Sequence, residues 1–333
     1  MGTHAHGDHR PLTWRRRIRL ARRFLTYALA IAPLLGLLRV LPGPVLRAFL
    51  VVVVEPVFWL ATRGASRRHL AHAFGDALPD AERRRIARAV ARNFVRGAGE
   101  LVELLRHGAG PFLERIDDRE ARALAERLRG DGSRGFVAIT AHLGNWELLG
   151  SWFAAAGIVD EIAAVATRHS NPWLDRRIVA FRARLGLATF HREESSRELL
   201  RYLKDGHAVA IVPDQDVKNV GGVFIEFFGK PAYTPTGPAR LALAAQVPLA
   251  CGVLVRVEGG RYRLLVSEPI EPDKTAPREA EILRLTKAWS AEIERMIRAC
   301  PEQWCWFHAR WRTTPERLAA RGRKPMGAGG DAD

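Results

Sequence analysis

Cysteine is scarce in this chain of 333 residues, which contains only Cys251, Cys300 and Cys305. An odd number of cysteines at these spacings forms neither a complete set of disulfides nor a zinc-binding cluster. We therefore expect reduced, partly buried thiols of a cytoplasmic protein.

Acidic residues are also under-represented, with 36 Asp and Glu against 52 Lys and Arg and a net charge of +16. This balance favours an anionic partner: nucleic acid, anionic lipid or an acidic carrier protein. No basic motif interleaved with aromatic residues and no zinc-finger spacing is present, so we expect no nucleic-acid partner. An arginine-rich composition also accompanies GC-rich genomes, which remains an alternative cause of the charge.

A long uninterrupted apolar run is missing as well. The basic cluster Arg15 to Arg23 precedes an apolar stretch at 24–38, which as a helix would span about 22 Å, less than the roughly 30 Å core of a bilayer. A second apolar run, 48–60, is interrupted by Glu55 and Pro56. We expect a polar, then basic N-terminus at 1–23 and a membrane-associated segment at 24–62 that either spans an anionic membrane or lies in its interface.

One metal-site pattern near the N-terminus is misleading. The residues from His4 to His9 have the His-x-His-x-Asp-His spacing of metallo-β-lactamase-type hydrolases. That motif needs a preceding core strand to hold its imidazoles, and only three residues come before it here. We expect no metal site and no cofactor.

From residue 136 onward, apolar runs of strand length alternate with segments of helical periodicity. We predict strands at 136–140, 162–166, 188–190, 208–212 and 248–257, and a hairpin turn at 258–261 into a strand at 262–267. Helices are expected at 116–128, 146–156, 173–185, 196–204, 237–245 and 278–298, and a helical region at 64–105 with a helix start at Pro79-Asp80. This pattern predicts an α/β fold with a mainly parallel, mixed sheet flanked by helices.

The most informative motif is the sequence from His142 to Glu147, directly after the predicted strand 136–140. Two residues five positions apart on one helix point about 140° away from each other. The pair can meet only if His142 ends the strand and Glu147 lies in the first turn of the next helix, with Asn145 as its N-cap. A carboxylate that orients an imidazole makes a general base able to deprotonate an alcohol. The segment has no Ser or Cys nucleophile, so the alcohol is expected to come from a substrate.

Polar residues follow two other predicted strands at the carboxyl edge of the sheet, where α/β proteins bind ligands. Arg168 and Asn171 follow one strand, and Asp214 and Gln215 follow another. We expect these four residues to bind substrate, with the arginine fork suited to a phosphate group. Arg310, among the C-terminal tryptophans, is the member of that segment best able to contact an anionic head group. The alternatives are that Arg168 is a solvated surface arginine and that the C-terminal tryptophans are packing residues.

The strand–His-x4-Glu–helix arrangement resembles the late acyltransferases of lipid A biosynthesis, the lauroyl/myristoyl transferase family within the glycerolipid-type acyltransferases. Five elements resemble that family in order, over roughly residues 63 to 312. They are 142–147, the Arg-x-x-Asn-Pro element at 168–172, Asp214-Gln215 after a strand, the long segment 227–242, and the tryptophan element 301–311.

The resemblance implies a membrane-bound enzyme on the cytoplasmic face of the inner membrane, with an acyltransferase domain at 63–312 and a flexible tail at 313–333. Its acyl donor would be acyl carrier protein or acyl-CoA, and its acceptor a lipid A precursor or related glycolipid. His142 would be the general base, and backbone N–H groups near Asn145 would stabilise the oxyanion. Two alternatives stay open: a non-catalytic basic membrane-binding protein on a degenerate scaffold, and an acyl hydrolase.

Overall fold

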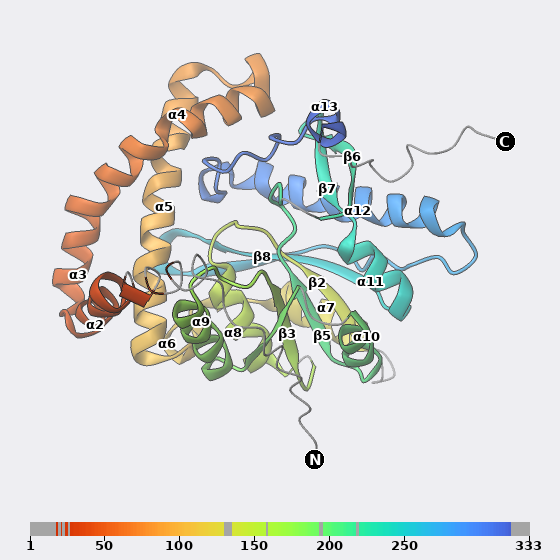
Figure 1. Cartoon of the computed structure of the whole chain (residues 1–333), viewed down its shortest axis with the longest axis horizontal. Helices are drawn as coiled ribbons and strands as arrows, with labels where there is room; N and C mark the ends of the chain where they lie inside the picture. Colours follow the sequence, from red (N-terminus) through yellow and green to blue (C-terminus); the bar gives the residue numbers. More distant parts are fainter. Residues whose placement is uncertain are drawn as a thin grey trace.

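The computed structural model describes residues 18, 21, 24, 25, 27–129, 135–157, 159–192, 196–217 and 220–320. The histidine-rich pattern at 4–9, most of the basic cluster and the end of the C-terminal tail lie outside these residues. The chain forms an α/β domain with a helical extension at its N-terminal side (Figure 1).

A seven-stranded sheet runs through the domain in the order β1-β9-β8-β2-β5-β3-β4. Its strands are β1 (Ile116–Asp117), β2 (Phe136–Ile139), β3 (Ile162–Ala166), β4 (Leu187–His191), β5 (Ala208–Ile211), β8 (Leu249–Arg256) and β9 (Tyr262–Val266). All neighbouring pairs are parallel except β8 and β9, which form the predicted hairpin. The predicted mainly parallel, mixed sheet is therefore confirmed.

Helices cover both faces of this sheet (Figure 1). The helices beyond the N-terminal extension are α5 (Asp80–His107), α6 (Gly110–Leu113), α7 (Arg119–Arg129), α8 (Trp146–Ala156), α9 (Pro172–Arg184), α10 (Ser196–Lys204), α11 (Gly237–Ala245), α12 (Arg278–Ala299) and α13 (Pro315–Ala319). The predicted helices after residue 136 all form, within a few residues of their expected bounds.

Alternation along β2 shows how the two cores form. Phe136 and Ala138 pack on one face with α7 and α8, whereas Val137 and Ile139 pack on the other with α11 and α12. Successive side chains of a strand point to opposite faces, so a strand covered on both sides is apolar throughout. Each core therefore packs against one face of the strands whose carboxyl ends carry the site.

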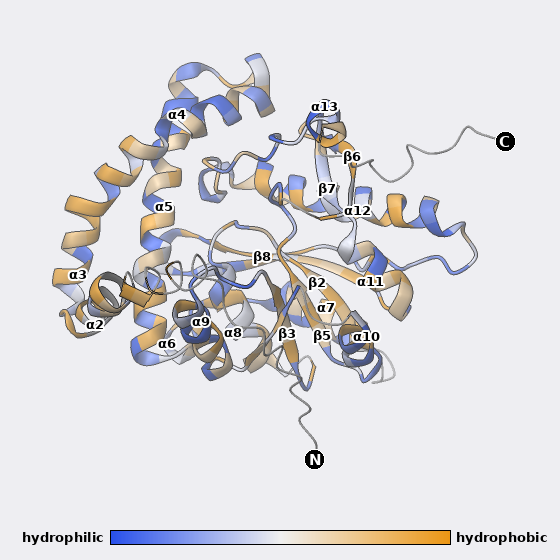
Figure 2. Ribbon diagram, viewed as in Figure 1, coloured by the Kyte–Doolittle hydropathy of each residue, from blue (hydrophilic) through white to orange (hydrophobic). Residues whose placement is uncertain are grey.

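The N-terminal extension contains α2 (Ala32–Val40), α3 (Gly43–Phe49), α4 (Glu55–Phe74), and the π-helical turns Tyr27–Ile31 and Leu50–Val54. The helical path continues through Glu55 and Pro56, the two residues that interrupt the apolar run of the sequence. Residues Gly43–Ala77 form one stretch long and apolar enough to cross a membrane, and 6% of its apolar window is buried. Figure 2 shows the hydrophobic colour along α2 and α3.

Large apolar side chains of this extension are exposed. We call one set of them the apolar strip: Val45, Phe49, Val51, Val52, Val53, Val57 and Leu60, which are 40% to 71% exposed. An exposed apolar surface of this extent is typical of a protein or membrane contact.

Three segments differ from the sequence-based expectation. Residues 116 and 117 pair with β9 as β1, so the helix expected at 116–128 begins later, as α7. The strands β6 (Gly222–Phe227) and β7 (Lys230–Pro235) form an antiparallel hairpin that the sequence did not predict. The expected tail at 313 begins inside the fold, because Thr313 donates its backbone N–H to Asp216 and Leu318 is buried.

Candidate active site

The loop between β2 and α8 holds His142 in a defined backbone conformation. Asn145 caps α8, as the spacing predicted, because its Oδ1 accepts the Leu148 N–H at 3.0 Å. Gly144 has φ +65°, and a Cβ at this position would collide with the Leu254 carbonyl oxygen. The loop is also bound from both sides, since Asn145 N–H donates to Leu254 and Gly144 N–H to Gln303. The turn therefore requires glycine and allows little movement of His142.

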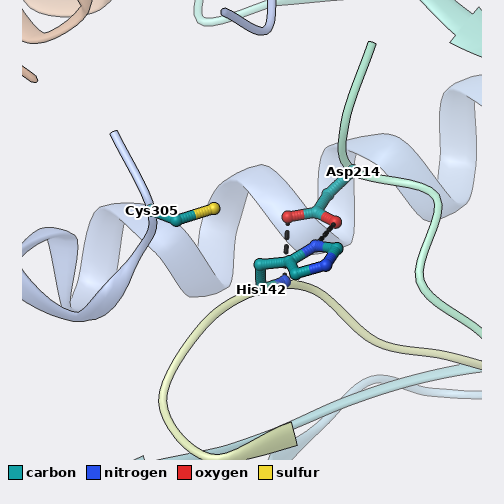
Figure 3. Close-up of side chains that lie close together, drawn as sticks. All are labelled: His142, Asp214 and Cys305. Carbon is teal, nitrogen blue, oxygen red and sulfur yellow. Dashed lines mark hydrogen bonds and ion pairs between the residues drawn. The ribbon is translucent and has the colours of Figure 1, made fainter. Parts of the chain in front are cut away.

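Asp214 is the carboxylate that contacts His142 (Figure 3). Nδ1 of His142 lies 2.7 Å from Asp214 Oδ1, and the His142 backbone N–H donates to Oδ2 at 2.9 Å. Trp304 Nε1 also donates to Oδ2, at 2.8 Å. Because Nδ1–H donates to the carboxylate, Nε2 of the neutral imidazole is left to accept a proton.

Charge and burial set the protonation of this pair. Burial by itself lowers the pKa of His142, but the charge and hydrogen bond of Asp214, with a smaller effect of Glu147, raise it above its ordinary value of 6.5. Burial raises the pKa of Asp214, and the contacts with His142 and Trp304 outweigh this and lower it. The pKa of the nearby His308 imidazole is lowered instead, because this imidazole is buried. The dyad is an ionised carboxylate behind an imidazole of increased basicity.

Glu147 occupies the predicted first turn of α8, but it does not orient His142. It pairs with Arg182 of α9, whose Nη2 lies 2.5 Å from Oε1 and whose Nε lies 3.2 Å from Oε2. The expectation that Glu147 holds the imidazole is thus corrected in favour of Asp214. Asp214 reaches Nδ1 because β5 lies beside β2, whereas the dipole of α8 and the Arg182 guanidinium already satisfy Glu147.

A cavity of about 160 Å³ opens beside His142. One wall is α5, and the opposite wall is formed by the β2–α8 loop and the segment Gln303–Phe307. The imidazole is 26% exposed, so a substrate oxygen can reach it. A second, apolar cavity lies between the sheet, α7 and α8, and Trp146 and Glu147 line both cavities. The apolar cavity therefore lies next to the cavity that His142 lines.

The other predicted ligand residues are placed differently. Arg168 is exposed at the end of β3, whereas Asn171 is buried and caps α9 by accepting the N–H groups of Trp173 and Leu174. The Gln215 side chain contacts Cys305 Sγ at 3.7 Å, next to the dyad. The structure thus brings Asp214 and Gln215 to His142 and gives Asn171 a capping role.

Arg310 lies in the interior, only 1% exposed. Its guanidinium donates to the Tyr233 carbonyl at 2.7 Å and to Thr234 Oγ1 at 2.6 Å, and it stacks over Phe227. Burial lowers its pKa to about 10. Arg310 therefore holds the β6–β7 hairpin rather than the expected anionic head group.

Cys305 lies beside the dyad, a proximity that its position in the sequence did not indicate (Figure 3). Ligand atoms of His142, Asp214 and Cys305 all lie within 4.8 Å of one another. Burial and the Asp214 charge raise the pKa of the Cys305 thiol well above its ordinary value. A thiol that keeps its proton is a poor nucleophile and a poor metal ligand, so the geometry fits an acid–base dyad.

Comparison with known proteins identifies a family that matches most of the chain. The sequence profile of the bacterial lipid A biosynthesis acyltransferase family matches residues 14–313. A phosphatidylinositol mannoside acyltransferase of Mycolicibacterium smegmatis is 26% identical over 252 residues, which cover 74% of this chain and 78% of the relative.

Two further relatives align over shorter regions. The lipid A biosynthesis lauroyltransferase of Escherichia coli is 28% identical over 193 residues, 56% of this chain and 60% of the relative. A phosphatidylinositol mannoside acyltransferase of Mycobacterium tuberculosis is 27% identical over 184 residues, 53% of this chain and 54% of the relative. The aligned regions of these two relatives thus span less than two thirds of their length.

Proposed function

Because the chain belongs to the bacterial lipid A biosynthesis acyltransferase family, we propose that it transfers a fatty acyl group from a thioester to a hydroxyl of a membrane glycolipid. The observation that carries this proposal is the His142–Asp214 dyad at the cavity beside α5, next to a Cys305 thiol whose raised pKa makes it a poor nucleophile. Acyl transfer to an external hydroxyl needs a base, and His142 Nε2 can serve as one.

In the proposed reaction, His142 Nε2 takes the proton of the acceptor hydroxyl as its oxygen attacks the thioester carbonyl carbon. Asp214 holds the Nδ1–H and stabilises the imidazolium that forms. The tetrahedral intermediate then collapses, the carbon–sulfur bond breaks, and the thiolate takes the proton from Nε2. The ester product and a free thiol leave, and the imidazole returns to its neutral form.

The groups that donate hydrogen bonds to the oxyanion differ from those expected from the sequence. The N–H groups of Gly144 and Asn145, the nearest candidates from the sequence, already donate to Gln303 and Leu254. Trp146 and Glu147, the first residues of α8 after the cap, line the cavity, and we propose their backbone N–H groups as the donors instead. Glu147 contributes through its charge, which raises the pKa of His142, and through its pair with Arg182.

The apolar cavity between the sheet and α8, of about 70 Å³, is the candidate for the part of the acyl chain next to the thioester. Its lining is mostly aliphatic and aromatic, including Leu124, Phe136 and Leu149, and its charged members, Glu147 and Arg182, form an ion pair. A fatty chain placed there would bring its thioester carbonyl to the end at Trp146, beside His142. Arg168, exposed at the same sheet edge, remains the candidate for a phosphate of the donor or acceptor.

The apolar strip supports membrane association, with the enzyme on the cytoplasmic face of the inner membrane. Its side chains are exposed on the same extension that packs along α5, the wall of the cavity beside His142. An acceptor lipid could therefore enter from the bilayer. In keeping with the names of the relatives, we propose a lipid A precursor or a phosphatidylinositol mannoside type of glycolipid as the acceptor. The donor that we propose, acyl carrier protein or acyl-CoA, is the one that the family resemblance implies.

Lipid mass spectrometry of the host with and without this gene tests the proposal. We expect one glycolipid to lose the mass of a single ester-linked acyl chain when the gene is deleted, and to regain it with the wild-type gene. An unchanged lipid profile, or a profile restored equally well by His142→Ala, would contradict the proposed reaction.

A further inference from the structure

A buried ion pair lies behind the catalytic loop, on the side away from Asp214. Glu100 of α5 is 8% exposed and Arg256 at the end of β8 is 7% exposed. Arg256 Nε lies 2.9 Å from Oε1 and 3.0 Å from Oε2 of Glu100, and its Nη2 also donates to Oε2. Burial alone raises the pKa of Glu100, but the contacts with Arg256 outweigh it, so the pKa is lowered and the carboxylate is ionised.

The same carboxylate reaches the catalytic loop. Asn145 Nδ2 donates to Glu100 Oε2 at 2.8 Å, while Asn145 Oδ1 caps α8. An ionised carboxylate can only accept hydrogen bonds. It therefore fixes the Asn145 amide in the one orientation that presents oxygen to the helix.

Gln303 ties Arg256 to this loop by a separate route. Its Oε1 accepts the Arg256 N–H at 2.9 Å, its Nε2 donates to the Arg256 carbonyl at 2.9 Å, and its own carbonyl accepts the Gly144 N–H. Gln303 thus holds Gly144 through the backbone of Arg256, whereas the ion pair holds Asn145 through the Glu100 carboxylate. Only Leu143 separates Gly144 and Asn145 from His142, whose N–H and Nδ1 both bind Asp214.

We propose that Glu100, held by Arg256, is a positioning residue that sets the distance between His142 and Asp214 by fixing Asn145. This inference rests on the proposed role of His142 as the base. A shift of Asn145 would be passed through Gly144, whose close approach to β8 leaves no room for compensation. It would lengthen both contacts with Asp214 and so lower the basicity of the imidazole. Asp214, Glu147 and His308 are the charged or titratable groups that act on His142, and Glu100 itself is not among them.

The test must separate positioning from folding, because removing Glu100 alone leaves Arg256 buried without its partner. The double variant Glu100→Leu with Arg256→Met removes both charges, and an apolar replacement of a buried ion pair is often neutral or stabilising. The control is Glu103→Gln, one turn along α5, where the carboxylate is partly exposed and pairs with Arg106 and His107.

We expect the double variant to unfold at a temperature close to that of the wild type. Its kcat should fall about tenfold or more, which corresponds to about 1.4 kcal/mol of transition-state stabilisation. The KM of the thioester donor should stay within about twofold, and the pKa of the His142 imidazole, followed by NMR, should decrease. Glu103→Gln should change none of these quantities.

If the double variant has the kcat, the stability and the His142 pKa of the wild type, the proposal is wrong and Glu100 is a structural residue. A lowered His142 pKa with full kcat would instead count against His142 as the base, since the imidazole would have moved without effect on turnover. The imidazole titration does not depend on turnover, so failure of the positioning role and failure of the proposed function give different results.

Discussion

Replacement of Asp214 by asparagine isolates the contribution of the dyad, because it removes a charge with almost no change in volume. Each carboxylate oxygen of Asp214 faces a donor: Oδ1 faces His142 Nδ1, and Oδ2 faces the His142 N–H and Trp304 Nε1. An amide supplies only one acceptor oxygen, so one of these positions must receive an NH₂ group.

The less costly arrangement places the NH₂ group opposite Nδ1, because the alternative breaks two hydrogen bonds instead of one. The imidazole then carries its proton on Nε2 and cannot accept one from the acceptor hydroxyl. Loss of a hydrogen bond to a charged group costs about 1.5–3 kcal/mol, or roughly one to two powers of ten in rate. With the unfavourable tautomer added, we expect kcat to fall about 10²–10⁴-fold, in line with the same substitution in a Ser-His-Asp triad.

The assay is thiol release from an acyl thioester in the presence of a glycolipid acceptor, with folding checked by circular dichroism. Asp216→Asn is not a suitable control, because Asp216 accepts the Thr313 N–H and holds the C-terminal segment. Asp205→Asn in the turn after α10 is better, since it makes the same chemical change away from the dyad. A folded Asp214→Asn protein with turnover within about threefold of the wild type would refute the reasoning.

Three further expectations follow from the same geometry. The neutral imidazole of His142 is the active form, and its pKa is raised above 6.5. As the pH decreases, kcat/KM should therefore fall with a midpoint above pH 6.5. A midpoint below pH 6.5 would contradict the dyad. Glu147→Gln should lower kcat less than Asp214→Asn, because it removes only a more distant charge and the pair with Arg182, and an equal or larger loss would restore Glu147 as the orienting residue. Val57→Glu in the apolar strip should reduce binding to bilayer vesicles by about tenfold or more, because a charge replaces a 63% exposed apolar side chain. The control Ala291→Glu, at an exposed position on α12, should bind vesicles as the wild type does. Equal binding by the two variants would argue against this strip as the membrane contact.

The sequence predicted β2, β3, β5 and β8 well because these strands are almost entirely apolar and end at a clear change of periodicity, whereas β1 was expected to be helical. It also predicted the turn at Gly144 and the cap at Asn145, both of which depend on neighbouring residues only. It did not predict β6 and β7, which lie between the predicted strand 208–212 and the predicted helix 237–245.

The partner of His142 was missed because it depends on strand order. In the structure, Ile139 of β2 lies opposite Ile211 of β5, and His142 and Asp214 each follow three residues later. Two parallel neighbours in this register bring those side chains together at the carboxyl edge. Nothing within 142–147 encodes that register, so the nearest carboxylate in sequence, Glu147, was preferred. Sequence also could not show that Arg310 is buried, since its neighbours in space come from the hairpin.

The most direct test of the account is the product formed by the purified enzyme from an acyl thioester and a glycolipid acceptor, identified by mass spectrometry beside a folded His142→Ala variant. The account predicts that the acceptor gains one alkali-labile acyl chain for each thiol released, and that His142→Ala forms this product about 10²–10⁴-fold more slowly. Release of free fatty acid with an unmodified acceptor, or acyl transfer at the wild-type rate by the His142→Ala protein, would contradict it.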